Sequence, residues 1–426
     1  MMQDWFREAK LGIFIHWGIY AVKGITESWS FFWGDISHED YMKQCQDFTA
    51  EHYDPQQWAK LFKQAGADYV VLTTKHHDGV ALWDTKQNDL SVVQKTPAKR
   101  DLIAPYCEAL RDQGIKVGLY FSQLDWSHPD YASVMNHKCP EAVFNKFAFP
   151  KDKKDHPERW GNYLKFHRGQ LQELMTQFAP VDLLWFDGDW ERSDEQWDMK
   201  GLRDFLHGFN PNVVINSRIG QYGDYATPEQ GFPTSAPDGE WEFCMTINDT
   251  WGYQPQDDKY KSLNQLLRYF IECISMGGRL LLDVGPMADG TIPQKEQQLL
   301  LRLGDWIKKH DEAIHGTEAG LPAGYFYGSS TISKDKETIY LFFYDIPRDS
   351  IAVKGIRNAI KRISVLGDTE ELNFEKFGGA EWMEVPGILW IDLPLDKVDD
   401  NVTVIKVELE GPLDLYQGQS GAIEQN

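Results

Sequence analysis

The sequence predicts an α/β fold, namely a (β/α)8-like barrel that is partly irregular and is followed by a C-terminal antiparallel β-sandwich. Three observations support this prediction. Several apolar runs end in polar side chains, helical stretches separate many of these runs, and short alternating runs take over from about residue 325. In a parallel barrel the carboxyl ends of the strands meet at one rim, which is where such folds carry their active sites.

Seven apolar runs are candidates for barrel strands: 11–16, 69–74, 117–122, 183–187, 213–216, 243–247 and 280–284. Helices are predicted over 55–66, 102–114 and 163–178, because apolar residues recur there at helical spacing and each stretch closes near a Gly or Pro. The segment 221–238 is rich in Gly, Pro and Asp and has no helical pattern. The second half of the barrel is therefore expected to be irregular there.

The length of 426 residues allows a barrel of about 250 residues or more and a smaller second domain. The runs 338–343, 362–365 and 402–407 alternate as antiparallel strands do, and glycines mark turns between them. We predict a catalytic barrel over residues 1–318, a β-sandwich over 319–412 and a polar tail over 413–426.

Composition and charge exclude several classes of partner. The chain is 42% hydrophobic and 25% charged, as globular proteins are, and its apolar runs stay below the roughly 18 residues of a membrane span. A net charge of −22 repels phosphate backbones, so neither nucleic acid nor a membrane is an expected partner. The 16 Trp residues suit a sugar ligand, because indole faces pack against the C–H faces of sugars, although most Trp side chains are expected in the core.

The first residues lack the charged and apolar regions of a secretory signal. We expect a cytoplasmic protein, or a periplasmic or extracellular one where a signal peptide has been removed. The five cysteines are widely spaced, which predicts neither a disulfide framework nor a CxxC metal site. The sequence does not indicate an oligomeric state.

Carboxyl groups are the strongest catalytic candidates. Hydrolysis of a glycosidic bond with retention needs one carboxylate as nucleophile and a second carboxyl group as proton donor. Asp187 ends an apolar run between Trp185-Phe186 and Gly188, which favours a nucleophile over a simple capping role. Glu229, in a polar loop bounded by Pro228, can exchange protons with solvent and is the favoured donor, whereas Glu242 enters a strand and is the alternative.

The pair His76-His77 raises the question of a metal site. Neighbouring residues of a strand point to opposite faces, so one ion is not expected to bind both rings unless the strand ends between them. Hydrogen bonds to sugar hydroxyls are the favoured role for these rings and for His16. Arg218 can orient a carboxylate or form an ordinary ion pair, and Trp251 can face a sugar or pack at the rim. No metal and no organic cofactor are predicted.

Five motifs together resemble the α-L-fucosidases of glycoside hydrolase family 29: Gly12-Ile13-Phe14-Ile15-His16-Trp17-Gly18, Lys75-His76-His77-Asp78-Gly79, Leu184-Trp185-Phe186-Asp187-Gly188, Trp241-Glu242 and Thr250-Trp251-Gly252-Tyr253. They occur in family order between roughly residues 5 and 290. The resemblance implies a retaining exo-acting hydrolase that removes terminal α-L-fucosyl residues from glycans by double displacement.

The resemblance also implies roles for individual residues. It places the nucleophile on Asp187 and contacts to the sugar methyl on Trp251. The rest of the fucose pocket would fall on His16, His76, His77, Tyr120, Trp185 and Arg218. The acid/base position varies within the family, and Thr227-Pro228-Glu229 is similar to the form in bacterial members.

Two motifs depart from the family pattern. Glu27-Ser28-Trp29-Ser30 stands where Glu-Trp-Tyr is common, and Leu281-Leu282-Asp283 stands where Leu-Leu-Asn is usual. We expect Glu27 and Trp29 to contact the substrate.

The expected substrate is a fucosylated oligosaccharide or glycoconjugate, and loops 31–40, 138–160 and 189–197 are expected to select its linkage. Three alternatives remain at this point. They are a related glycosidase that accepts α-L-galactosides, a metal-dependent barrel hydrolase and a catalytically silent carbohydrate-binding protein.

Overall fold

The computed structural model describes residues 2–131 and 157–418. Most of the loop 138–160 and part of the polar tail lie outside the described residues. The chain divides into two compact units, the first made of residues 1–261 and 281–301 and the second of residues 262–280 and 302–426. These units are defined by contacts within the chain, and the predicted domain boundary after residue 318 stays a prediction.

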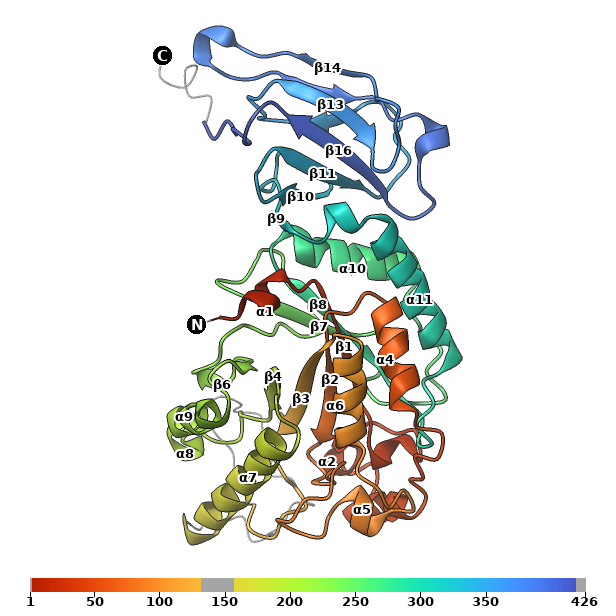
Figure 1. The fold of residues 1–426 in the computed structure, drawn as a ribbon, viewed down its shortest axis with the longest axis vertical. Helices are drawn as coiled ribbons and strands as arrows, with labels where there is room; N and C mark the ends of the chain where they lie inside the picture. Colours follow the sequence, from red (N-terminus) through yellow and green to blue (C-terminus); the bar gives the residue numbers. More distant parts are fainter. Residues whose placement is uncertain (1, 132–156, 419–426) are drawn as a thin grey trace. The chain divides into compact units, whose positions relative to one another are not determined.

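The first unit contains a curled parallel sheet of seven strands in the order β5-β4-β3-β2-β1-β8-β7 (Figure 1). Its strands are β1 (Leu11–Ile15), β2 (Tyr69–Lys75), β3 (Lys116–Ser122), β4 (Leu183–Asp187), β5 (Val214–Ile215), β7 (Glu242–Thr246) and β8 (Arg279–Val284). All seven predicted strands are present, with ends that differ by at most a residue or two. This order is that of a (β/α)8-like barrel, and the predicted fold class is confirmed.

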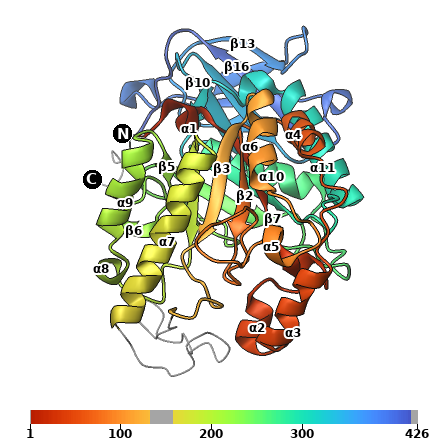
Figure 2. The same ribbon diagram turned by 60° about the horizontal axis from the view of Figure 1, so that its bottom comes forward.

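Helices lie between many of these strands in the sequence. The described helices are α1 (Asp4–Glu8), α2 (Trp29–Trp33), α3 (His38–Met42), α4 (Pro55–Gln64), α5 (Val92–Lys95), α6 (Ile103–Asp112), α7 (Pro157–Gln177), α8 (Asp194–Trp197), α9 (Met199–Phe209), α10 (Leu263–Ser275) and α11 (Gln294–Lys309). In both ribbon views β3 is visible between α6 and α7 (Figures 1 and 2). Because helices cover a parallel sheet, its strands are buried along their whole length, as β2 is.

Local sequence explains the start of α4. The Asp54 carboxylate accepts the backbone N–H groups of Gln56 and Gln57 at 3.0 and 3.1 Å, and Pro55 occupies the first helical turn. A side-chain cap and a proline at this position both favour a helix start. The helix then buries Trp58 and Phe62 on one face.

The segment 224–230 joins the two edges of the sheet without forming a regular strand. Beside β5, the Asp224 N–H donates to the Ile215 carbonyl at 2.7 Å. Beside β7, the Gln230 N–H donates to the Cys244 carbonyl at 3.0 Å, and Glu229 forms an isolated parallel bridge with Cys244. The predicted irregularity in this part of the barrel is therefore present, and it carries Glu229.

The second unit contains two antiparallel sheets, as predicted. One sheet has the order β13-β16-β11-β10-β9 and the other has the order β12-β15-β14. The strands are β9 (Thr317–Ala319), β10 (Ser329–Ser333), β11 (Thr338–Phe343), β12 (Ile351–Val353), β13 (Ile360–Val365), β14 (Phe374–Phe377), β15 (Ile388–Ile391) and β16 (Thr403–Leu409). A core of buried apolar residues from both sheets, among them Leu341, Leu389 and Val407, holds this unit together.

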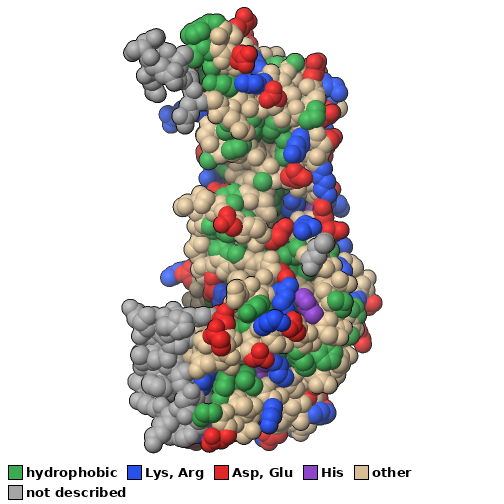
Figure 3. Space-filling model, turned by 90° about the vertical axis from the view of Figure 1, so that its left-hand side faces the viewer, with side chains coloured by type: hydrophobic (Ala, Val, Ile, Leu, Met, Phe, Trp, Pro, Cys, Tyr) green, Lys and Arg blue, Asp and Glu red, His purple; other side chains and the backbone are tan. Residues whose placement is uncertain are grey.

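The surface carries charged side chains of both signs, as the 25% content of charged residues leads us to expect. On the face in Figure 3, Lys and Arg side chains are interspersed with Asp and Glu side chains. No helix within the described ranges combines the length and the apolar character needed to cross a lipid bilayer.

Candidate active site

A small pocket of about 170 Å³ lies at the carboxyl ends of the strands in the first unit. Ligand sites for drug-sized molecules span roughly 300–1,000 Å³, so this pocket suits one small ring. Its lining includes ten of the predicted site residues and two that were not predicted: Phe14, His16, Glu27, Trp29, His76, Tyr120, Trp185, Asp187, Trp190, Arg218, Glu229 and Trp251. The predicted residues His77 and Glu242 are not part of this lining.

Arg218 brings the two carboxylates of the pocket together. Its guanidinium donates to Asp187 Oδ1 at 2.6 Å through one nitrogen and to Glu229 Oε2 through the other. The guanidinium also lies over the Trp185 ring, with Cζ 4.6 Å from the ring centroid. A planar cation held by an aromatic face and two carboxylates has a fixed orientation. β6 (Arg218–Gln221), a short strand after β5, supplies this side chain.

Asp187 receives a second hydrogen bond from Tyr120. The Tyr120 hydroxyl donates to Asp187 Oδ2 at 3.0 Å. β3 and β4 pair in parallel, and Tyr120 lies opposite Trp185, two residues before Asp187. Burial, and then the charge of Asp187, raise the pKa of Tyr120 well above its usual value, so the hydroxyl keeps its proton. With Arg218 and Tyr120 fixing its two oxygens, the carboxylate is held at the end of β4.

Gly188 is required by the turn that follows Asp187. Its φ of +88° favours glycine, and a Cβ atom built there would lie 2.4 Å from Leu124 Cγ. The sequence Asp187-Gly188 thus lets the chain leave the strand immediately after the carboxylate.

His77 lies beside Asp187, outside the pocket lining. Ser122 Oγ donates its proton to the Leu124 carbonyl at 2.7 Å, so it accepts from His77 Nδ1 at 2.6 Å. The proton of the neutral ring then lies on Nδ1 and leaves Nε2 as an acceptor, 3.6 Å from Asp187 Oδ2. Burial lowers the pKa of His77 well below its usual value. His77 Nε2 has no hydrogen-bond partner among the described residues, so it can accept the proton of one hydroxyl group.

The strand β2 ends at Lys75, just before the histidine pair. The alternation expected of strand residues therefore does not govern these rings, whose centroids lie 4.2 Å apart. His76 Nδ1 lies 2.6 Å from Ser28 Oγ, and the His16 Nδ1 lies 2.6 Å from Asp283 Oδ1. Burial lowers the pKa of His16 and of His76, so both rings are neutral at pH 7 and offer hydrogen-bonding nitrogens.

Glu27 is a buried acid at the same pocket. Its Oε1 accepts the Gly252 N–H at 2.6 Å, and a Cβ atom at Gly252 would approach that oxygen to 2.9 Å. Burial raises the pKa of Glu27 to about 7. The protein can therefore present a protonated Glu27 hydroxyl near neutral pH.

Glu242 has a different environment from Glu229. It is fully buried, and its Oε1 accepts the Trp185 indole N–H at 2.9 Å while its Oε2 accepts the Tyr69 hydroxyl at 2.5 Å. The Glu229 side chain is 36% exposed and lines the pocket. Glu242 thus fixes the aromatic wall from behind, whereas Glu229 faces the space where a ligand would bind.

Phe14 and Trp190 line the pocket although the sequence did not single them out as site residues. Phe14 comes from the middle of β1 and contacts Trp185 with ring centroids 5.0 Å apart. Trp190 follows Asp187 by three positions in a loop. Its position immediately after the strand end was the one available signal, because the carboxyl ends of barrel strands carry ligand contacts.

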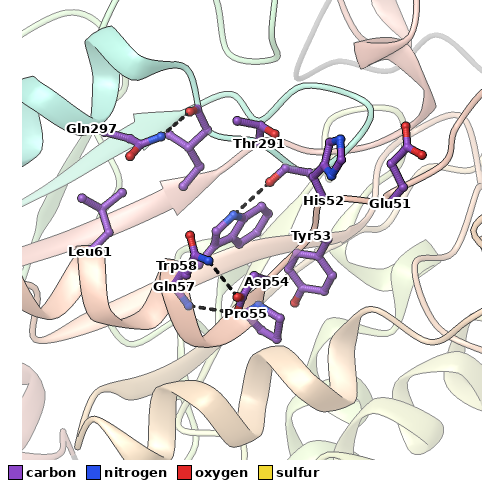
Figure 4. A pocket seen from close by; sticks show the side chains of 12 residues that line it. Glu51, His52, Tyr53, Asp54, Pro55, Gln57, Trp58, Leu61, Thr291 and Gln297 are labelled. Carbon is purple, nitrogen blue, oxygen red and sulfur yellow. Dashed lines mark hydrogen bonds between the residues drawn. The ribbon is translucent and has the colours of Figure 1, made fainter.

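A larger cavity of about 680 Å³ in the first unit lies at a different place (Figure 4). Several of its polar side chains already have partners in the protein, since Asp54 accepts from Gln57, the Trp58 indole donates to the Gly290 carbonyl and Gln297 donates to the Ile292 carbonyl. It contains neither a pair of facing carboxylates nor a shared arginine. The smaller pocket at the strand ends is therefore the candidate active site.

Comparisons with known proteins show which family the chain resembles. A family model described as Alpha-L-fucosidase matches residues 1–312. The human tissue alpha-L-fucosidase is 33% identical over 342 residues, which cover 74% of this chain and 69% of the human protein. The solved structure of alpha-L-fucosidase isoenzyme 1 from Paenibacillus thiaminolyticus has a TM-score of 0.85 at 35% identity, covering 96% of this chain and 98% of that one. A GH29 alpha-L-fucosidase from Bacteroides thetaiotaomicron, solved as a trapped covalent intermediate, has a TM-score of 0.82 at 26% identity and covers 96% and 97%.

Proposed function

The chain belongs to the α-L-fucosidase family, glycoside hydrolase family 29, and on that premise we propose that it is a retaining exo-α-L-fucosidase that removes terminal α-L-fucosyl residues from glycans. The observation that carries this proposal is the single guanidinium of Arg218 that contacts both Asp187 and Glu229 inside a pocket for one small ring. Two carboxyl groups on either side of one sugar are what retaining hydrolysis needs.

In the proposed first step, an Asp187 oxygen attacks the anomeric carbon of fucose as the bond to the leaving oxygen breaks. Glu229 gives its proton to that oxygen, so the leaving sugar departs as an alcohol and fucose becomes an ester of Asp187. In the second step Glu229 takes a proton from water, whose oxygen attacks the same carbon and releases Asp187.

Arg218 and Tyr120 hold the attacking carboxylate in place throughout. A protonated Glu229 carries no charge, so in the first step its contact with Arg218 weakens from an ion pair to a hydrogen bond accepted by the carbonyl oxygen, while the charged contact between Arg218 and Asp187 persists. A sugar hydroxyl can donate its one proton to His77 Nε2, which would help to place the ring for attack.

Fucose is favoured over L-galactose because Phe14, Trp185 and Trp251 give the pocket apolar surface, which suits a methyl group. Apolar pockets discriminate poorly against one extra hydroxyl, so α-L-galactosides are expected to be slower substrates. The natural substrate is proposed to be a fucosylated oligosaccharide or glycoconjugate.

The test is turnover of an aryl α-L-fucoside by the wild type and by Asp187→Ala. The substitution should abolish turnover, and added azide should restore part of it by taking the place of the missing carboxylate. Turnover that persists in Asp187→Ala without azide would refute the nucleophile assignment. A chelator should leave wild-type turnover unchanged, and loss of activity on chelation would favour a metal-dependent hydrolase instead.

A further inference from the structure

Three indole rings form a row that begins in the pocket and ends in solvent. Trp29 and Trp190 both line the pocket, and their ring planes lie within 20° of each other at a centroid distance of 5.9 Å. Trp33 stacks on Trp29 with the same angle and distance. Trp33 is 61% exposed, the largest exposed fraction of any large apolar side chain described in the first unit.

The row stands on a rigid support. Trp29 and Trp33 are the first and last residues of α2, so they lie four positions apart on one helix face. Gly34 closes this helix in the left-handed conformation with φ of 89°. Beneath the row, the buried Trp126 ring contacts Trp29 edge-on at 5.2 Å and stacks on Phe32 at 4.6 Å.

An exposed indole that is already held in place loses little conformational freedom when a ligand covers it, so it is well suited to binding. Its flat face matches the C–H face of a pyranose ring. The pocket accepts one small ring, so the rest of a glycan must leave through the opening. Trp29 and Trp190 are part of the pocket wall, and Trp33 extends the same surface outward.

We propose that Trp190, Trp29 and Trp33 form a platform that binds the sugar residues on the leaving-group side of the fucosidic bond. The proposal rests on the proposed fucosidase function and goes beyond it by making neutral oligosaccharides, rather than small fucosides, the preferred substrates. The first two indoles contact the sugar next to fucose, and Trp33 contacts a sugar further along the chain.

The experiment compares two substrates in the full-length protein. One is α-L-fucosyl fluoride, whose leaving group is a single atom and cannot reach the platform. The other is the fucosylated oligosaccharide of three or more sugars that the wild type cleaves fastest in a panel of linkages. Trp33→Ala should lower kcat/KM for the oligosaccharide about tenfold more than for the fluoride, as expected for a loss of about 1.4 kcal/mol of binding, mainly through a higher KM.

Two further variants complete the design. Trp33→Phe keeps a flat ring and should recover most of the loss. Trp382→Ala is the matched control, because Trp382 is 79% exposed and lies in the second unit, and it should change neither substrate. Equal changes for both substrates in Trp33→Ala would overturn the platform while leaving the fucosidase function intact. A wild type that cleaves neither substrate would refute the proposed function, and the platform with it.

Discussion

Replacing Glu229 and Glu242 with glutamine, one at a time, distinguishes their roles. The first variant should change kcat/KM and the second should change the free energy of unfolding. If Glu229 is the proton donor, Glu229→Gln removes general acid catalysis, which contributes roughly a hundredfold to ten-thousandfold. That loss should appear in kcat/KM for an oligosaccharide, whose leaving alkoxide needs a proton. It should be far smaller for α-L-fucosyl fluoride, because fluoride leaves as a stable anion.

Glu242→Gln should act through structure instead. Both oxygens of Glu242 accept buried hydrogen bonds, from Trp185 and from Tyr69. A glutamine amide has one oxygen, so in either orientation its NH2 group faces one of these donors. Leaving one buried donor without its acceptor costs about 1–3 kcal/mol, and this cost should appear in the free energy of unfolding.

Steady-state kinetics with both substrates and urea unfolding of both variants form the assay. Glu229 is partly exposed, so Glu229→Gln is expected to unfold at nearly the wild-type urea concentration. Glu242→Gln should unfold earlier and lose activity on both substrates by a similar factor. A loss confined to the oligosaccharide in Glu242→Gln, with an equal loss on both substrates in Glu229→Gln, would reverse the assignment of the acid.

Two other predictions follow from buried groups of the first unit. Tyr120→Phe removes one hydrogen bond to Asp187, and we expect kcat/KM for fucosyl fluoride to fall about tenfold to a hundredfold in steady-state assays, since a hydrogen bond to a charged group is worth about 1.5–3 kcal/mol. Unaltered kinetics would mean that Arg218 alone fixes the carboxylate. Burial raises the pKa of Glu296 from 4.5 to about 8, so the folded state retains a proton that the unfolded state releases. Stability should therefore fall as pH rises from about 4.5 through about 8, by an amount on the order of 5 kcal/mol, and Glu296→Gln should flatten this slope in urea unfolding measured across that range. Identical slopes in the two proteins would contradict the buried, protonated state of Glu296.

The architecture was predictable because its signals are local. A buried parallel strand is apolar along its whole length, and its polar continuation marks the end of the strand at the rim. Asp187, His16 and Tyr120 could be assigned to one rim on this basis, before any contact between them was known. The irregular stretch before β7 was predictable from its Gly, Pro and Asp content.

The choice between Glu229 and Glu242 was not decidable from sequence, because it depends on contacts between distant residues. The two side-chain oxygens of Glu242 accept hydrogen bonds from Trp185 and Tyr69, which are 57 and 173 positions away in the sequence. Periodicity also does not reveal that β2 ends at Lys75 and frees His76 and His77 from strand alternation. Phe14 could not be found because an apolar residue inside a strand looks the same whether it faces the core or a pocket.

The segment 224–230 has a consequence for the evolution and engineering of this enzyme. In a regular strand, inserting or deleting one residue reverses which side chains face inward for the remainder of its length. Glu229 belongs to a stretch that is bonded to β7 through the backbone of Ala226, Pro228 and Gln230, whereas residues 231–238 after it form no regular element. Length changes within 231–238 can therefore be absorbed locally, so the loop beside Glu229 can be reshaped while Glu229 and Asp187 keep their places.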